Sequence, residues 1–477
     1  MKKIHVTVIV LFSLLLISSA SYGLLYVYVN QPNFPKGVQV GGWALDDKPR
    51  KQVLAELQTR IQQLQDWPVT IEVAEPNPIT MTHPATELGV SYHVNSFKAA
   101  VKQLDEGNLW ERAYARYRFP QTFPLDMAYN EQTFQQLLSP AWEKETFGIP
   151  AEAVRRITAN DQVQYIPEKS VRRIDWKTLS ALVQNKLHRD LIEVNDGVKP
   201  DPIRILLPLY TLKPEVTIDS LKQEGIERKI VQFSTGLGNS SQGRVHNVSA
   251  AAQAIHGMIL LPGGVFDYEK VIRKAEKDYG FREAPVIVNG RLTPGIGGGI
   301  CQVSSTVYNA ALLTGLDIVE RRNHSMPVKY LPKGLDATFA SGAINFRFRN
   351  STEKSLLIHA KVQGGRMVVK FFGTFPENVS YALESHTIET LSVPVKYVSS
   401  NVLPEGAQQV LQNGQPGYIV ETIRTKRVDG QVVESKTISR DTYKAQSRLI
   451  ARSGHISMPD PKQPSVVEDG IREGNQP

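Results

Sequence analysis

The central fold of this chain of 477 residues is decided by the stretch Gly297-Gly298-Gly299-Ile300-Cys301-Gln302-Val303-Ser304-Ser305-Thr306-Val307-Tyr308-Asn309-Ala310. Three glycines before an apolar-periodic run predict a flexible loop that opens into a helix, which we expect from Gln302 to Leu313. Cys301, the only cysteine in the chain, falls where that helix begins. Unpaired N–H groups and the helix dipole favour a thiolate at such a position. Cys301 is therefore the first candidate for chemistry.

The beginning of the chain predicts a membrane anchor. An apolar run extends from Ile4 to Val29, and about 20 residues suffice to span a bilayer. Lys2 and Lys3 precede the run, so we expect a cytoplasmic N-terminus and an extracytoplasmic chain after Asn30. A cleaved signal peptide, with small residues at Ser18-Ser19-Ala20-Ser21, is the alternative. We favour retention, because the apolar run continues past those residues and ends in interfacial tyrosines.

Composition narrows the class of protein. A single cysteine excludes an intramolecular disulfide, and the more than 440 residues after the anchor suffice for about three domains. The net charge of +8 and the pI near 9.2 favour polyanionic partners. Outside a membrane these are peptidoglycan, other anionic wall polymers or lipid headgroups, and not nucleic acid. A solvated basic surface that has no partner is the alternative.

The pattern of apolar and polar residues along the chain predicts a multidomain α+β protein. After the anchor (residues 1–30), residues 31–216 show an α+β pattern, with helices expected at Lys51–Leu64 and Trp176–Leu187. A weak repeat of this pattern of strands and helices suggests two subunits in this region, residues 37–119 and 124–205.

Residues 217–375 form a central α/β or α+β block. We expect a helix at Ser249–Ile259, an extended run at Ala343–Phe348, and a hairpin over Val286–Leu292. The Asn289-Gly290 pair suits a type I′ turn in that hairpin. Residues 376–455 carry short apolar runs and regularly spaced glycines, which are typical of a small all-β module. Residues 456–477 are rich in Pro, Asp, Glu and Gly, so a disordered tail is predicted.

The central motifs resemble the VanW family. The resemblance rests on the opening stretch and on four further segments, namely Arg244-Val245-His246-Asn247, Leu261-Pro262-Gly263-Gly264-Val265-Phe266, Glu320-Arg321-Arg322-Asn323-His324-Ser325 and Gly334-Leu335-Asp336-Ala337-Thr338. The chain departs from the family pattern at Asp267-Tyr268-Glu269, where a Ser-Phe-Asn-like stretch is more typical, and at Asn345, where an acidic residue is common. The family occurs near glycopeptide-resistance genes and implies no settled reaction, cofactor or metal.

Two flanking regions resemble wall-associated families. Residues 37–216 are similar to a peptidoglycan-binding domain that often precedes VanW cores. Residues 379–454 resemble the G-five (G5) family in Leu403-Pro404-Glu405-Gly406, Leu411-Gln412-Asn413-Gly414-Gln415-Pro416-Gly417 and Val428-Asp429-Gly430. That family is associated with adhesion and with proposed binding of N-acetylglucosamine. The resemblances together imply work at a bacterial cell wall.

The order Cys301, His324, Asp336 suggests a catalytic triad. In hydrolases of this order an imidazole deprotonates the thiol and a carboxylate fixes the imidazole tautomer. Backbone N–H groups from Gly299 to Gln302 would stabilise the oxyanion, and the Gln302 side chain would add a donor. We expect the substrate to contact the glycine run Gly297, Gly298 and Gly299, together with Arg244, Asn247 and Arg321.

Structural roles compete with this hypothesis. A lone cysteine among apolar residues is often a small buried hydrophobe, and Asp336 has Arg321 or Arg322 as alternative partners. Histidine spacing predicts no metal site, and the glycine run lacks the Lys-Ser/Thr of a phosphate loop. Four tryptophans that could stack on sugars or anchor small cores are Trp43, Trp110, Trp142 and Trp176.

Two classes of function therefore remain. The first is an anchored wall-binding protein, and the second is a cysteine-dependent peptidoglycan amidase, peptidase or acyl transferase. The sequence leaves the oligomeric state open.

Overall fold

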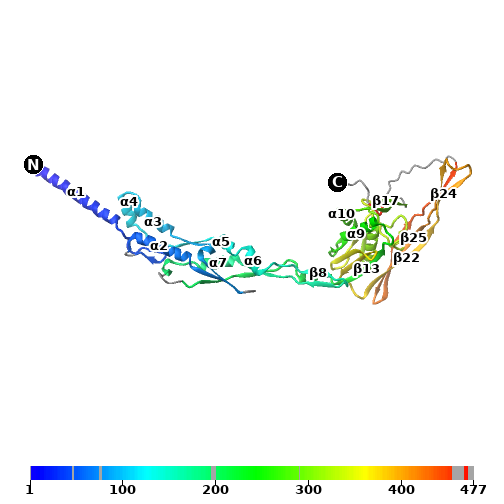
Figure 1. The fold of residues 1–477 in the computed structure, drawn as a ribbon, viewed down its shortest axis with the longest axis horizontal. Helices are drawn as coiled ribbons and strands as arrows, with labels where there is room; N and C mark the ends of the chain where they lie inside the picture. Colours follow the sequence, from blue (N-terminus) through cyan, green and yellow to red (C-terminus); the bar gives the residue numbers. More distant parts are fainter. Residues whose placement is uncertain are drawn as a thin grey trace. The chain divides into compact units, whose positions relative to one another are not determined.

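The computed structural model describes residues 2–45, 48–74, 78–194, 200–288, 291–453 and 467–470. The chain forms two compact units (Figure 1), and the first comprises residues 1–152 and 169–215. The second comprises residues 153–168 and 216–477. Residues 153–168 thus interrupt the first unit in sequence but belong to the second unit.

The first unit begins with an apolar helix. Its elements are α1 (Lys2–Val29), β1 (Gln39–Val40), β2 (Trp43–Ala44), α2 (Arg50–Gln65), β3 (Pro68–Val73), β4 (Ile79–Pro84), the 3-10 helix η1 (Ala85–Leu88), β5 (Val90–His93), α3 (Asn95–Asp105), α4 (Leu109–Tyr117), β6 (Thr122–Phe123), β7 (Asp126–Tyr129), α5 (Glu131–Leu137), α6 (Pro140–Phe147), β10 (Val171–Ile174), α7 (Trp176–Lys186), η2 (Leu191–Glu193), β11 (Ile203–Leu206) and β12 (Leu209–Leu212). The helices expected at Lys51–Leu64 and Trp176–Leu187 are present as α2 and α7.

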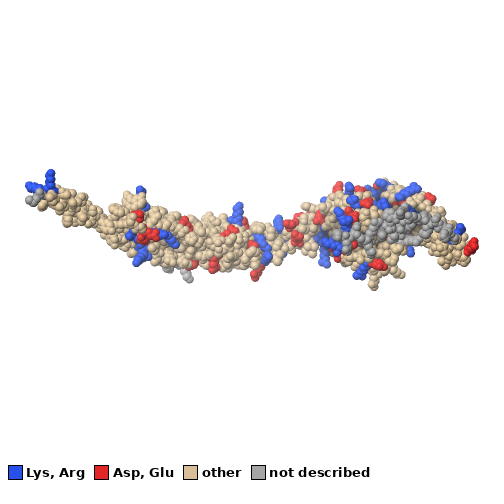
Figure 2. All heavy atoms as spheres, turned by 90° about the horizontal axis from the view of Figure 1, so that it is seen from above, with Lys and Arg blue, Asp and Glu red and all other residues tan. Residues whose placement is uncertain are grey.

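Helix α1 is long and apolar enough to cross a membrane, judged by length and composition. Its side chains are exposed along nearly the whole helix, and Val29 is its one buried residue. Figure 2 shows basic side chains at its free end and uncharged ones along the rest of it. A signal sequence near an N-terminus passes the same test of length and composition.

One hydrophobic core runs through the rest of the first unit. It includes Val53 and Leu57 of α2, Phe97 of α3, and Leu179 and Val183 of α7, all fully or almost fully buried. Parallel pairing of β11 with β3 places Ile203 beside Val69, far away in sequence. Residues from both suggested subunits, 37–119 and 124–205, therefore share this core.

The second unit carries a four-stranded sheet of order β13-β21-β20-β14. The elements of this part are β8 (Val154–Ile157), β9 (Val163–Ile166), α8 (Ile218–Gln223), β13 (Arg228–Gly236), α9 (Gln242–Ile255), β14 (Met258–Leu260), β15 (Val265–Asp267), α10 (Tyr268–Tyr279), β16 (Glu283–Val288), β17 (Arg291–Ile296), α11 (Ile300–Leu313), β18 (Asp317–Glu320), β19 (Arg347–Arg349), β20 (Leu356–Gln363) and β21 (Arg366–Gly373). Helices α9 and α11 pack on the sheet and contact each other.

Two predicted elements of this part need correction. Helix α9 begins seven residues earlier than expected, because the Ser241 hydroxyl caps it by accepting from the Arg244 N–H at 3.3 Å. It also ends earlier, since Met258 pairs with Ile358 in the sheet. The extended run expected at Ala343–Phe348 is a strand only from Arg347.

The expected hairpin forms from β16 and β17, although Asn289 and Gly290 lie outside the described residues. A third strand, β28 (Val467–Glu468), pairs with β16 on its other side. These residues belong to the tail that we expected to be disordered. That expectation is wrong for residues 467–470, because their charged side chains find specific partners; residues 454–466 and 471–477 lie outside the described residues.

The all-β module completes the second unit. It has two three-stranded sheets, of order β22-β25-β26 and β23-β27-β24. Its strands are β22 (Val379–Leu391), β23 (Val395–Ser400), β24 (Gln408–Gln412), β25 (Gly417–Val428), β26 (Gln431–Tyr443) and β27 (Arg448–Ser453). The predicted small β-rich module is present.

Gly334 joins the central block to this module. Its backbone has φ +88°, its N–H donates to the Tyr443 hydroxyl at 2.6 Å, and its carbonyl accepts from the Thr422 hydroxyl at 3.2 Å. A Cβ added at this position would lie 2.3 Å from the Thr422 hydroxyl oxygen. Only glycine therefore allows the two surfaces to meet so closely.

We predict that Gly334→Ala lowers the thermal unfolding midpoint of the detergent-solubilised chain. Strain at positive φ costs about 1 kcal/mol, and overpacking against Thr422 adds roughly 1–3 kcal/mol. The matched control is Gly342→Ala, which has φ +70° and no described atom within 4 Å of the added Cβ. Equal midpoints for the two variants would contradict the proposed close approach.

Candidate functional site at the start of helix α11

Helix α11 is buried from Ile300 to Leu312. Three of its polar side chains bond to backbone groups of residues 335–337. Ser304 Oγ donates to the Ala337 carbonyl at 2.6 Å, Ser305 Oγ accepts from the Ala337 N–H at 2.9 Å, and Asn309 Nδ2 donates to the Leu335 carbonyl at 2.7 Å. The polar face of the helix thus positions the loop that carries Asp336.

The three glycines of the glycine run allow other parts of the protein to pack closely against this segment. Gly297 and Gly299 have φ +86° and +109°. A Cβ on Gly298 would lie 2.5 Å from the Pro285 carbonyl oxygen in β16, and one on Gly299 would lie 2.9 Å from Arg244 Cγ in α9. All three glycines are buried. The expectation that they face a substrate is therefore wrong, because protein atoms already occupy the space that the missing side chains leave.

Cys301 is fully buried. Its Sγ accepts from the Phe339 N–H at 3.0 Å and donates to the Phe339 carbonyl at 3.3 Å. Among the described residues, His324 is not a hydrogen-bond partner of this sulfur. The structure thus brings His324 and Asp336 of the predicted triad together, whereas the Cys301 sulfur has other partners.

Burial raises the pKa of the Cys301 thiol well above its ordinary value, and the carboxylate of Asp469 raises it further. The Phe339 amide acts in the opposite direction but is weaker. The expected thiolate is therefore wrong for this conformation. The N-terminus of α11 is already used by a carboxylate, because the Cys301 N–H donates to Asp469 Oδ1 at 2.7 Å.

His324 and Asp336 form a buried pair, as the sequence suggested. The carboxylate oxygen Oδ2 of Asp336 lies 2.6 Å from His324 Nδ1 and accepts from the His324 N–H at 2.7 Å. Burial alone would raise the pKa of Asp336, but the hydrogen bond and charge of His324 lower it to about 2. Burial likewise opposes a charged imidazole, yet Asp336 raises the pKa of His324 on balance. The buried carboxylate of Asp336 thus favours the charged form of the His324 imidazole.

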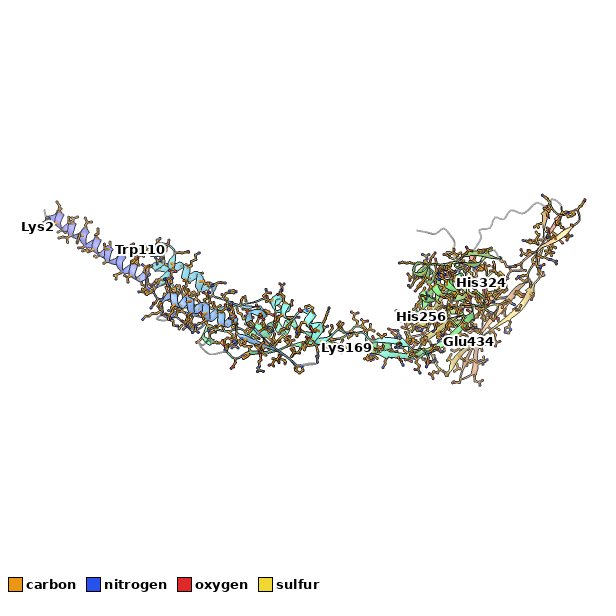
Figure 3. All side chains as sticks on the ribbon, viewed as in Figure 1. Lys2, Trp110, Lys169, His256, His324 and Glu434 are labelled. Atoms are coloured by element: carbon orange, nitrogen blue, oxygen red, sulfur yellow. The ribbon has the colours of Figure 1, made fainter. Side chains whose placement is uncertain are left out.

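The second ring nitrogen of His324 has no hydrogen-bond partner among the described residues, although it is buried. Figure 3 places His324 in the second unit. A buried polar atom without a partner costs about 1–3 kcal/mol. Such an atom marks a place where a ligand group or a water molecule is accommodated.

Asp336 also joins the central block to the β module. The Tyr443 hydroxyl donates to Asp336 Oδ1 at 2.5 Å. Arg321 Nε donates to the Asp336 carbonyl at 2.7 Å, and its Nη1 donates to Asp441 Oδ1 at 2.5 Å. Burial alone would lower the pKa of Arg321, but Tyr308, Asp441 and Asp336 raise it overall. Arg321, expected to contact substrate, is only 6% exposed and is a link between domains.

The other expected binding residues are also engaged within the protein. Asn247 Nδ2 donates to the Arg282 and Gly298 carbonyls at 2.8 and 3.0 Å. Gln302 Nε2 donates to the Gly236 carbonyl at 2.8 Å and its Oε1 accepts from Arg244 Nη2 at 3.1 Å. The expected role of Gln302 as an oxyanion donor is therefore wrong, because both ends of its amide are occupied. Arg244 also pairs with the tail residue Asp469, with Nη1 3.3 Å from Asp469 Oδ2.

The sequence motifs gave no sign that Glu468 and Asp469 belong to this site. Asp469 is 5% exposed, and Glu468 Oε2 accepts from the Ser325 N–H and hydroxyl at 3.0 and 2.9 Å. An acidic pair after two valines in a Pro-rich tail is the one signal that could have pointed to them.

The two departures from the family pattern contact each other. Asn345 Nδ2 donates to Asp267 Oδ1 at 2.8 Å, and Asn345 Oδ1 accepts from the Glu269 N–H at 3.0 Å. The Asn345 amide thus holds both the capping residue Asp267 and the first turn of α10.

The first unit has a separate hollow of about 1350 Å3. Its lining includes Trp67, Lys186, His188 and Arg189. None of the four tryptophans considered for sugar stacking lines this hollow. Trp43 is buried, and Trp142 and Trp176 pack against the core. The fourth, Trp110, is 72% exposed.

Two curated relatives match this chain over part of its length. The uncharacterized protein YoaR of Bacillus subtilis (strain 168) is 37% identical over 173 residues, which cover 36% of this chain and 57% of that protein. The vancomycin B-type resistance protein VanW of Enterococcus faecalis (strain ATCC 700802 / V583) is 29% identical over 155 residues, which cover 31% of this chain and 56% of that protein. The chain thus spans a little more than half the length of these relatives.

Family models identify two domains in this chain. The solved G5 domain of an IgA1 protease is 22% identical and covers 16% of this chain and 89% of its own, but its TM-score of 0.14 is too low to support a statement on the fold. The model described as VanW like protein matches residues 243–372, and the model described as G5 domain matches residues 384–454. Within the second unit, this chain therefore contains a VanW-like domain followed by a G5 domain.

Proposed function

We propose that this chain is a membrane-anchored extracytoplasmic wall protein that binds peptidoglycan. The observation that carries the proposal is the G5 domain, a type associated with cell-wall binding, joined to the VanW-like domain by buried contacts of Arg321 and Tyr443. Because these links are buried and charged, the two domains are expected to meet the wall as one body. The basic surface of the chain favours an anionic polymer.

The geometry around Cys301 supports binding over catalysis. A nucleophilic thiol needs a base within hydrogen-bond reach, and the sulfur is instead held by the Phe339 backbone. The raised pKa of the Cys301 thiol keeps it protonated at neutral pH. In this conformation the site holds groups in place and does not activate them.

Membrane attachment draws support from helix α4. Trp110, Tyr114 and Tyr117 of α4 share one face at helical spacing and are 72%, 64% and 77% exposed. Helix α4 contacts α1 (Figure 1), and Arg112 Nη2 donates to the Asn30 side chain at 3.0 Å. Exposed Trp and Tyr beside the end of a spanning helix are typical of the membrane–water interface. We infer that this aromatic face rests on the outer lipid headgroups.

The prediction for α4 is that Trp110 (Figure 3) contacts lipid in reconstituted vesicles. Lipids brominated near the headgroup should quench part of the tryptophan fluorescence, and Trp110→Phe should remove most of that quenching. Trp176→Phe is the matched control, because Trp176 packs edge-on against Phe134 inside the first unit. Undiminished quenching in Trp110→Phe would count against an interfacial α4.

For the wall, we predict that the detergent-solubilised chain pellets with purified peptidoglycan and does so less at high salt, since screening weakens exposed charge contacts. Trp67→Ala in the hollow of the first unit should weaken pelleting by roughly threefold to tenfold, because aromatic stacking contributes about 1 kcal/mol. Trp110→Ala is the control, as this residue lies outside the hollow. The binding proposal fails if the chain stays in the supernatant at low ionic strength.

A second candidate function is a cysteine-dependent wall hydrolase or acyl transferase. The unpartnered Nε2 of His324, with Nδ1 fixed by Asp336, favours it, since this pair has the arrangement of a base and its orienting carboxylate. Catalysis would require a rearrangement that frees the sulfur from Phe339.

We expect iodoacetamide to label Cys301 more slowly than a free thiol at pH 7, with the rate rising only in alkaline solution. The raised pKa of the thiol and its burial both predict this. Because Cys301 is the only cysteine, mass spectrometry of the intact chain follows the reaction directly. Fast labelling at pH 7 that slows in His324→Ala would favour the hydrolase instead.

A further inference from the structure

Residues 467–470 occupy a site between two distant parts of the second unit. Strand β28 pairs antiparallel with β16, with Glu468 opposite Ile287 and Val467 opposite Val288. On the other side, Gly470 forms a parallel bridge with Ala340. We call this place, with its backbone and side-chain donors, the tail site. Backbone pairing of an extended segment along an open strand edge is a common mode of peptide recognition.

Asp469 is the most deeply held residue of the segment. Its carboxylate accepts from the Cys301 N–H at 2.7 Å and pairs with Arg244 at 3.3 Å. Its own N–H donates to the Phe339 carbonyl at 3.3 Å. The backbone of Asp469 adopts φ +62°, a conformation that costs free energy in a residue with a side chain. The free energy gained from the carboxylate contacts therefore exceeds the free-energy cost of this backbone conformation.

Glu468 engages a second, separate set of donors. Its Oε2 accepts from both the backbone N–H and the hydroxyl of Ser325. Ser325 directly follows His324 in the chain. The two neighbouring carboxylates of the segment thus face donors from α9, from α11 and from the loop after β18.

His324 gives an independent sign that this place is built for a ligand. Its imidazole is 1% exposed, and Nε2 has no hydrogen-bond partner among the described residues. The charges of Asp469 and Glu468 both act on this imidazole and raise its pKa, in addition to the effect of Asp336. A buried ring nitrogen without a described partner therefore lies within reach of the charge of the segment's carboxylates.

We propose that the tail site binds an extended peptide with two neighbouring carboxylates, and that residues 467–470 are its internal ligand. The strand edge of β16 supplies backbone pairing, while Arg244, the start of α11 and Ser325 select the acidic side chains. An acidic peptide from outside takes the site by displacing the tail. Wall peptides carry carboxylates. If the ligand is a wall peptide, the proposal rests on the proposed function. Binding of an acidic peptide in general does not rest on it.

The test uses the full chain and a fluorescent synthetic peptide, Ser-Val-Val-Glu-Asp-Gly-Ile-Arg, which copies residues 465–472. In the wild type, the tethered segment competes at a high effective concentration. The double variant Glu468→Gln/Asp469→Asn weakens that competitor and should bind the peptide at least about tenfold more tightly than the wild type, as expected for loss of charge-assisted hydrogen bonds. A peptide with Gln and Asn at the two acidic positions should bind weakly to both chains.

Glu434→Gln is the matched control, since it removes an exposed carboxylate on β26 (Figure 3) and should leave peptide binding at the wild-type level. Should the double variant fail to fold, Glu468→Gln alone keeps the Asp469 contacts and serves in its place. Hydrogen exchange adds a second measurement: the Cys301 amide should exchange faster in the double variant and slow again when peptide is added. Equal peptide affinity in wild type and variant, or binding that ignores the two carboxylates, would overturn the proposal. Neither result depends on pelleting with peptidoglycan.

Discussion

The burial of α11 is the constraint on which the second unit depends. A helix surrounded on every side must find partners for its polar groups inside the protein. Ser304 and Ser305 find them in the Ala337 backbone, the Asn309 amide nitrogen finds one in the Leu335 carbonyl, and Gln302 finds them in Gly236 and Arg244. These contacts fix the loop that carries Asp336. The position of every candidate catalytic group therefore follows from how this one helix is packed.

Asp336 extends that constraint into the G5 domain. A buried carboxylate is stable only when opposite charges and donors surround it, and His324, Arg321 and Tyr443 meet this need. Two of these partners lie in the VanW-like domain and one lies in the G5 domain. The arrangement that looks like half of a catalytic triad is therefore also the polar centre of a domain interface, so loss of activity in an Asp336 variant would not by itself demonstrate catalysis.

The sequence predicted what depends on local pattern. The apolar run of α1, the periodicity of α2 and the helix after Cys301 were all visible, and chain order suggested the His324–Asp336 pair. The partners of the thiol were not visible. Phe339 and Asp469 lie 38 and 168 residues away from Cys301 in sequence, and both contacts use groups whose placement is set by tertiary packing. The glycine run was misinterpreted for the same reason, because a missing side chain does not reveal whether a ligand or the protein fills the space.

Pairing of β28 with β16 also bears on how copies of this chain behave beside one another. The β16–β17 hairpin ends in an open edge, and an open edge offers unpaired N–H and C=O groups to any extended chain nearby. Where copies of this chain are concentrated, such an edge would favour adhesion between neighbours. Residues 467 and 468 cover part of that edge with the chain's own backbone. The tail thereby protects the molecule against self-association.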